Sequence, residues 1–208
     1  METIVHTFLV PSAAGAWFAS ASTDADPRRT ILWALLRGAA SEPSPLTRLA
    51  ELAGLPDRKA AGSLVFKMQR EGWLGSEEEP FRFDDGPLDE TLATLLPALS
   101  TEGCAVLADA AGLTIASTGF PPDVVRRLSA HGAGLLPYIA HLEKDAPLNN
   151  APATLALLDS HSGIRIAVRP LCFGRHRFHL TLAGAPAANG EAVVRLVALL
   201  GRRYLGQH

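Results

Sequence analysis

A short, wholly apolar segment near the middle of the chain constrains the fold more than any other feature. Residues 103–108 read GCAVLA, with no alternation of polar and apolar side chains. The turn sequence Asp109-Ala-Ala-Gly112 follows at once, and a second β-type segment returns over residues 113–117. A strand without alternation is typically buried on both faces. The pattern therefore predicts a central strand of a sheet that carries helices on its faces.

The rest of the second half supplies neighbours for this strand. Leucines at helical spacing predict a helix over residues 88–99, and a longer helix opens at Pro121-Pro122-Asp123. Gly132, Gly134 and Pro137 interrupt the longer helix, so we expect a kink or a close helix contact there. The remaining predicted elements are strands at residues 154–159, 164–169 and 175–182, turns at 160–163 and 170–174, and a final helix at about 189–204 with Asn189 as its N-cap. The order α-β-β-α-β-β-β-α is that of an α+β fold.

The first half follows a different plan. Residues 4–10 and 16–20 are rich in β-formers and are separated by turn residues, which predicts a hairpin. Asp24 and Asp26-Pro27 then open a helix that ends at Gly38. The elements expected next are helices over residues 46–53 and 58–71 around a tight turn at 54–57, and two strands at 73–74 and 81–83. Helix, helix, turn, helix and a two-stranded ribbon form the plan of a winged helix.

Two stretches resemble known families. LTRLAELAGLPD (residues 46–57) followed by SLVFKMQREGWL (63–74) resembles the winged helix-turn-helix family, over roughly residues 27–85. GCAVLADAAGLTIAS (103–117) after a leading helix resembles the roadblock (dynein light chain) family, over roughly residues 88–206. Profilin-like and sensor domains share much of that element order. The residues DDGP at 84–87 predict a linker. With the two resemblances, we expect an N-terminal hairpin plus winged-helix domain (1–86) and a roadblock-like domain (87–208) with a five-stranded sheet and helices on both faces.

Composition bounds the class of protein. The 208 residues include 19 Lys+Arg and 21 Asp+Glu, for a net charge of −2, and 48% are hydrophobic, which indicates a folded globular chain. The charge is unevenly divided, with −3 on residues 1–87 and +1 on residues 88–208. Neither half has the basic footprint of a bulk nucleic-acid binder. Cys104 and Cys172 have no CxxC spacing and suit buried, reduced thiols.

The N-terminal apolar run lacks the features of a signal peptide. It has Glu2 and His6 near its start, is broken by Pro11 and Gly15, and has no preceding Lys or Arg. No run approaches the ~20 apolar residues of a membrane helix. We therefore expect a cytoplasmic protein.

Catalytic motifs are missing from the sequence. It contains no G-x-x-x-x-G-K-[ST], no G-x-S-x-G and no H-E-x-x-H. His176 and His179 are three apart on one predicted strand, so they point to opposite faces and cannot chelate a metal together. We predict no catalytic residue, no metal site and no cofactor.

The third helix of the first half is the candidate nucleic-acid surface. Side chains that could face outward together are Arg58, Lys59, Ser63, Lys67 and Arg70. On a DNA-binding winged helix this face enters the major groove. Glu77, Glu78 and Glu79 at the predicted wing tip would repel phosphates. A protein-docking or merely structural role for the module is therefore favoured over DNA binding.

A second candidate surface is the hairpin of the last two strands. We expect Arg165, Arg169, Arg175 and Arg177 to share one face with His179. Such a patch suits an acidic protein partner, because Arg pairs bidentately with carboxylates. An ordinary solvated sheet face is the alternative.

The roadblock resemblance adds a third surface and a function. It implies a homodimer that joins through the middle helix and the adjacent edge strand. The matching residues are Val124, Leu128, Leu135, Leu136, Ile139, Leu155 and Leu157, although ordinary core packing is equally compatible with each of them. The resemblance further implies a small Ras-like GTPase as partner and a regulatory or scaffold role without enzymatic activity. The alternative is a DNA-binding transcriptional regulator whose C-terminal domain senses a ligand and dimerises.

Overall fold

The computed structural model describes residues 8–38, 46–83, 86–145, 154–187 and 189–206. Its centre is a five-stranded antiparallel sheet in the order β4-β3-β7-β6-β5. The strands are β3 (Ala105–Asp109), β4 (Thr114–Thr118), β5 (Leu155–Leu158), β6 (Ile164–Phe173) and β7 (His176–Ala183). Four residues of the wholly apolar segment, 105–108, lie in β3, between β4 and β7. The α+β class with a five-stranded sheet is confirmed.

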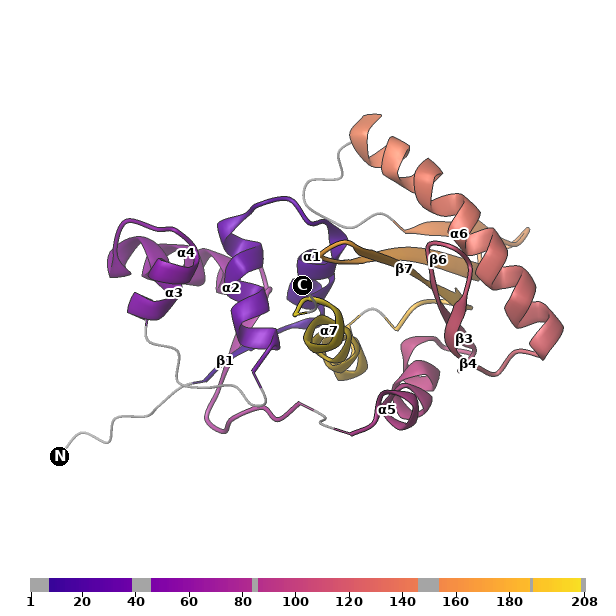
Figure 1. Cartoon of the computed structure of the whole chain (residues 1–208), viewed down its shortest axis with the longest axis horizontal. Coiled ribbons are helices and arrows are strands. Elements are labelled where there is room, and N and C mark those ends of the chain that lie inside the picture. The colour runs from indigo at the N-terminus through magenta and orange to yellow at the C-terminus, as the bar shows by residue number, and fades with distance from the viewer. Residues whose placement is uncertain (1–7, 39–45, 84–85, 146–153, 188, 207–208) are drawn as a thin grey trace.

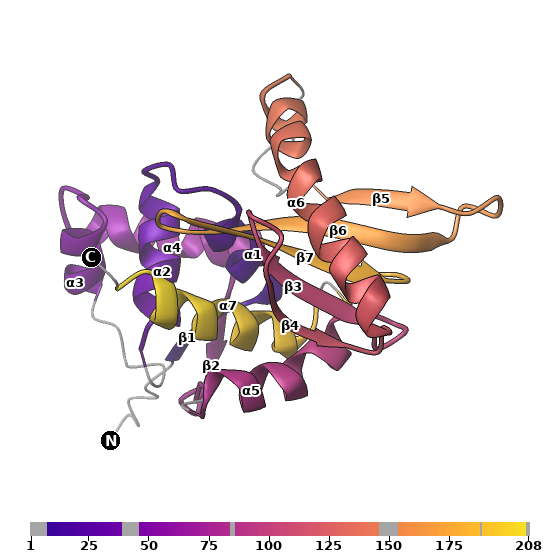
Figure 2. The ribbon, with the colours of Figure 1, turned by 45° about the vertical axis from the view of Figure 1, so that its right-hand side comes forward.

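Helices cover both faces of this sheet (Figures 1 and 2). The helix α6 (Pro122–Asp145) crosses one face and packs on β3, β4, β6 and β7. The other face carries α5 (Leu88–Leu95) with the 3-10 turn η1 (Leu96–Leu99), and α7 (Glu191–Tyr204). α6 runs as one helix through Pro137. The predicted close contact lies instead at Gly132, which packs on the sheet rather than on another helix.

The N-terminal half adds a helical module. Its elements are β1 (Phe8–Pro11), α1 (Ala13–Ala21), α2 (Pro27–Leu36), α3 (Leu46–Leu52), α4 (Arg58–Arg70) and β2 (Leu74–Glu77). Asp26 and Asp57 cap α2 and α4 by accepting hydrogen bonds from the backbone N–H groups of Arg28 and Ala60. Three of the predicted helices are therefore present.

The predicted N-terminal hairpin is wrong. Residues 16–20 lie within α1, which Ser12 caps by accepting a hydrogen bond from the backbone N–H of Gly15. The strand β1 instead pairs with β2, more than sixty residues away in sequence. Most residues of α1 are buried, and its sequence is apolar around nearly the whole helix. A sequence of this kind shows no helical period.

The two-stranded wing is also not seen among the described strand pairings. β2 has β1 as its partner, and Arg82 forms only a single-residue bridge. Phe81 and Phe83 pack on α7, with the guanidinium groups of Arg195 and Arg202 over their rings at 4.9 and 5.6 Å. This segment fastens the N-terminal module to α7 rather than extending from it.

One continuous hydrophobic core joins the two halves. Trp17 and Ile31 of the first half belong to the same buried cluster as Leu180 and Leu196 of the second. Trp33 of α2 meets Phe173 of β6 edge-on at 5.7 Å. The boundary at residues 86/87 stays a prediction, and the packing across it is extensive.

Two local predictions in the second half need correction. β6 continues through Pro170 to Phe173 and does not turn at residues 170–174. Pro170 is tolerated because the pairing of β5 with β6 ends at Leu155 and Val168, so no described strand pairs with β6 at Pro170 on that side. The N-cap of α7 is Gly190 and not Asn189.

Candidate functional site

The sheet has two edge strands, β4 and β5, and β5 is the one with exposed large apolar side chains. Its described partner is β6 alone, with Leu157 opposite Ile166 and, after a register shift, Leu158 opposite Ile164. The irregularity places both leucines beside isoleucines of one face, and their side chains are 62% and 60% exposed. Two adjacent exposed leucines on an edge strand are an unusual arrangement, because natural edges are generally protected by charge or proline.

The helix α6 continues this apolar surface. Leu135 and Ile139 pack against Leu155, Ile166 and Val168 at the β5 side of the sheet. Tyr138 and Leu142 extend from the same part of the helix and are 55% and 40% exposed. We call Tyr138, Leu142, Leu157 and Leu158 the α6–β5 surface.

The seven residues predicted for dimerisation are not all available to a partner. Leu157 is exposed, Ile139 is buried in the chain's own core, and the other five are half-buried. Leu128 packs on Val106 and Val125. Sequence reasoning missed Tyr138, Leu142 and Leu158. The i, i+4 spacing of Tyr138 and Leu142 was the signal that could have identified them.

The predicted arginine patch is divided between the two faces of the sheet. Cys172 pairs with Arg177 across a two-residue turn, so odd-numbered residues of β6 oppose even-numbered residues of β7. Arg165 and Arg169 therefore point to the α7 face, and Arg177 points to the α6 face with His179. Arg175 lies in the turn and is exposed. The expectation of a common face is wrong.

Arg169 is largely buried and has an aromatic partner. Its guanidinium lies over the Trp17 ring at 3.9 Å, and its Nε has no hydrogen-bond partner in the described structure. Burial lowers the pKa of Arg169 to about 10. This arginine fastens α1 to β6 and is poorly placed to bind a partner.

A buried polar group connects α6 to the sheet. His179 of β7 lies directly beneath Gly132, where any Cβ would overlap the imidazole ring. Its Nε2 donates to the Ser129 carbonyl at 3.0 Å, because a carbonyl can only accept, which leaves Nδ1 to accept from the Thr181 hydroxyl at 3.1 Å. Burial lowers the pKa of His179, and the contact with Ser129 partly opposes that shift.

A pocket of about 570 Å³ lies between α6, the ends of β6 and β7, and the loop after α1. Its apolar lining includes Leu136 and Phe178, and Asp24, Glu143 and Arg177 contribute the charged groups. Cys172 in the wall is a free thiol whose pKa is raised by burial. Cys104 is also a free thiol. Within the described ranges no group of three or more His, Cys, Asp or Glu side chains could hold a metal ion.

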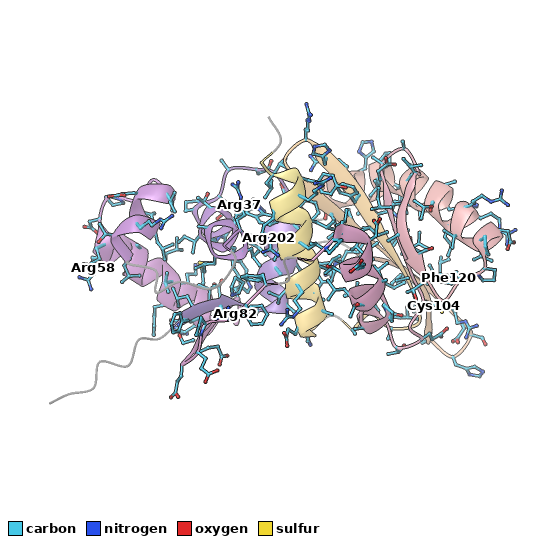
Figure 3. All side chains as sticks on the ribbon, turned by 60° about the horizontal axis from the view of Figure 1, so that its bottom comes forward. Arg37, Arg58, Arg82, Cys104, Phe120 and Arg202 are labelled. Atoms are coloured by element: carbon cyan, nitrogen blue, oxygen red, sulfur yellow. The ribbon has the colours of Figure 1, made fainter. Side chains whose placement is uncertain are left out.

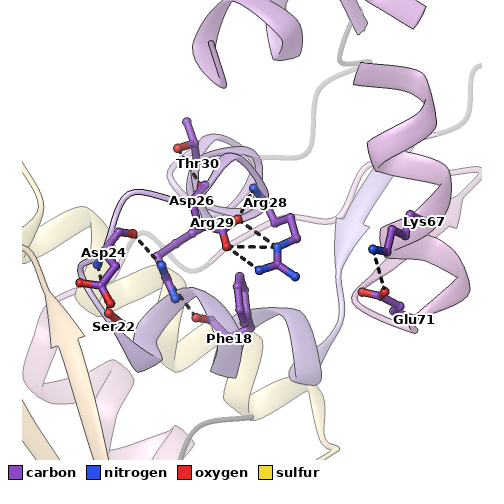
Figure 4. Close-up of polar contacts among 9 residues, drawn as sticks. All are labelled: Phe18, Ser22, Asp24, Asp26, Arg28, Arg29, Thr30, Lys67 and Glu71. Atoms are coloured by element: carbon purple, nitrogen blue, oxygen red, sulfur yellow. Dashed lines mark hydrogen bonds and ion pairs between the residues drawn. The ribbon is translucent and has the colours of Figure 1, made fainter. Parts of the chain in front are cut away.

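All five residues predicted for nucleic-acid contact lie exposed on α4, namely Arg58, Lys59, Ser63, Lys67 and Arg70. Figure 3 shows Arg58 at the outer end of the helical module, far from Cys104 and Phe120 at the opposite end of the molecule. Lys67 pairs with Glu71 at 3.9 Å (Figure 4).

The chain is similar to several solved structures at low sequence identity. No protein-family model and no curated protein matches the chain. A roadblock/LC7 domain from Streptomyces avermitilis is 18% identical, with 59% of this chain and 100% of that chain aligned at a TM-score of 0.40. MglB from Myxococcus xanthus is 18% identical over 56% of this chain and 86% of its own, at a TM-score of 0.33. The gliding protein MglB from Thermus thermophilus is 17% identical over 59% and 91%, at 0.33. None of the described helices is long and apolar enough to cross a membrane.

Proposed function

We propose that this protein is a non-enzymatic cytoplasmic regulator that works as a homodimer and binds a small Ras-like GTPase. The observation that carries the dimer is the α6–β5 surface. A second copy placed against it in antiparallel orientation would pair its own β5 with this one and extend the sheet across the two-fold axis.

The physical argument for this surface is the state of the edge strand. β5 reads LALL, with no charge and no proline to prevent pairing. Leu157 and Leu158 add exposed apolar area on β5, and Tyr138 and Leu142 add more on α6. Exposed apolar area of this kind supports an interaction site. Pairing two copies would satisfy the backbone of β5 and remove these leucines from water together.

The GTPase partner rests on the roadblock resemblance of residues 88–206. In that class the dimer holds the switch segments of the GTPase and biases their conformation, which requires no catalytic residue from the regulator. The helical module, in which α3 and α4 pack together, would serve as an additional docking unit for protein.

The proposed dimer is tested by introducing negative charges on the edge strand β5. Leu157→Asp with Leu158→Asp should convert a dimer to a monomer in analytical ultracentrifugation, with the circular dichroism spectrum unchanged. Leu113→Asp is the matched control, because Leu113 is 66% exposed on the β3–β4 turn and away from the surface. A wild-type protein that sediments as a monomer at 100 µM contradicts the proposal.

The partner is tested with purified small GTPases from the same organism, each loaded with GDP or with a non-hydrolysable GTP analogue. Calorimetry should show one GTPase binding preferentially in its GTP-loaded form. Arg165→Glu and Arg177→Glu are measured separately, because they lie on opposite faces, and the one on the binding face should weaken binding at least tenfold. If no GTPase binds in either nucleotide state, the proposal of a GTPase partner is rejected.

A transcriptional role is the second candidate, favoured by one observation. The five α4 residues predicted to contact DNA are all exposed. A gel shift of duplex DNA that weakens with salt, and that is lost in Lys59→Ala with Lys67→Ala, would support it. The absence of a shift with genomic fragments at low salt rules it out.

A further inference from the structure

The outward face of α4 combines cations with one large apolar side chain. Lys59, Ser63, Phe66 and Arg70 follow one another at spacings of four, three and four residues, so they lie within about 60° of each other around the helix axis. Phe66 is 62% exposed at the centre of this stripe. We call these four residues the α4 stripe.

The two cations of the α4 stripe, Lys59 and Arg70, make no ion pair with a described residue. Of the four α4 cations, only Lys67 makes an ion pair with a described residue, and it lies to the side of the stripe. Lys59 and Arg70 flank Phe66 with no ion pair to any described residue. The small Ser63 leaves the surface open between Lys59 and Phe66. The side chain of Phe66 is therefore an exposed apolar group between two available positive charges.

We infer that the α4 stripe docks an acidic protein segment that carries an apolar anchor residue. Carboxylates of such a segment would pair with Lys59 and Arg70, and its apolar side chain would cover Phe66. The inference deepens one part of the proposed function, the docking role of the helical module. It depends neither on the dimer nor on the GTPase.

The neighbouring strand argues for protein over duplex DNA. Gln69 of α4 donates its side-chain N–H to the Ser76 hydroxyl of β2 at 2.7 Å, which fixes β2 alongside the helix. Glu77, Glu78 and Glu79 follow directly and are all exposed. A recognition helix lies in a groove about 12 Å wide with phosphates on both sides. These three carboxylates would face the backbone of a bound duplex, whereas a single peptide segment is narrow enough to avoid them.

The decisive experiment places a photo-crosslinking amino acid, p-benzoylphenylalanine, at position 66 of the full-length chain in its native cells. Mass spectrometry then maps the cross-linked segment. We expect a protein segment with an excess of Asp and Glu around an apolar residue. The same adduct should form in the Leu157→Asp/Leu158→Asp background, so that failure of the dimer or of GTPase binding is separable from failure of this inference.

The mapped segment, synthesised as a fluorescent peptide, provides the quantitative test by anisotropy. Lys59→Glu with Arg70→Glu should weaken its binding at least tenfold, and Phe66→Ser should weaken it by a similar factor. Arg126→Glu with Arg203→Glu is the matched control, because both side chains are exposed and lie outside α4. An adduct with DNA, an adduct with a segment lacking acidic excess, the absence of any adduct, or binding insensitive to the α4 variants overturns the inference.

Discussion

At the scale of single residues, the contact between Gly132 and His179 decides how closely α6 approaches the sheet. Gly132 leaves room for the imidazole ring, and the ring in turn bonds to the Ser129 carbonyl of the same helix. Gly132 and Gly134, which are separated by a single residue, therefore have different roles. Only the first is required by packing, since nothing lies within 4 Å of a Cβ at Gly134.

Substituting these two glycines should have opposite effects. Gly132→Ala forces α6 or His179 to move and should lower the free energy of unfolding by about 1–3 kcal/mol. Gly134→Ala is the control and should raise it by about 0.5–1 kcal/mol, because alanine favours a helix interior over glycine. Urea denaturation of both variants checks this, and equal effects would contradict the packing argument.

His179 should also make stability depend on pH. Its folded-state pKa lies below its ordinary value of 6.5, so the unfolded chain binds more protons. Its contribution to stability is therefore present above about pH 6.5 and is lost as the pH falls from that value through the lower folded-state pKa. We expect His179→Gln to flatten the fall in unfolding free energy between pH 7 and 5. Parallel slopes for wild type and His179→Gln would show that His179 is not the responsible group.

At the scale of elements, contacts at the N-terminal end of α1 position this helix, because its sequence has no helical period. Ser12 accepts from the Gly15 N–H at 3.1 Å, donates to the Gly72 carbonyl at 2.6 Å, and its own backbone N–H donates to the Trp73 carbonyl at 3.0 Å. One residue thus starts the helix and ties it to the end of α4. Stacking of Phe18 on Trp73 at 4.3 Å strengthens the same junction.

Removing the Ser12 hydroxyl tests this junction. Ser12→Ala should cost about 1–2 kcal/mol of unfolding free energy, because it deletes a helix cap and an anchoring hydrogen bond. Ser160→Ala, in the exposed β5–β6 turn, should stay within about 0.5 kcal/mol of the wild type. Thermal or urea denaturation of the pair decides, and a small effect at Ser12 would mean that burial alone holds α1 in place.

At the scale of the whole molecule, the shared core predicts a single cooperative unfolding transition. The chain offers natural probes, because all three tryptophans (17, 33 and 73) lie in the first half and both tyrosines (138 and 204) in the second. Tryptophan fluorescence and ¹⁹F NMR of 3-fluorotyrosine should give urea midpoints that coincide within about 0.2 M. Separate midpoints would indicate that the predicted domains at 1–86 and 87–208 unfold independently.

The sequence by itself determined the order of the elements in the second half, the interior position of β3 in the sheet, and the capped starts of α2 and α4. Each follows from local periodicity or from a capping side chain next to the element it starts.

Tertiary structure decided the rest. α1 is apolar on nearly every side, so its sequence has no period to distinguish helix from strand. Burial between α2, α7 and β6, together with the Ser12 cap, makes it a helix. The arginines of β6 and β7 separated because a two-residue turn fixes the pairing, and a shift of one residue moves a side chain to the other face. The α6–β5 surface and the α4 stripe became visible only when packing showed which apolar side chains the fold leaves uncovered.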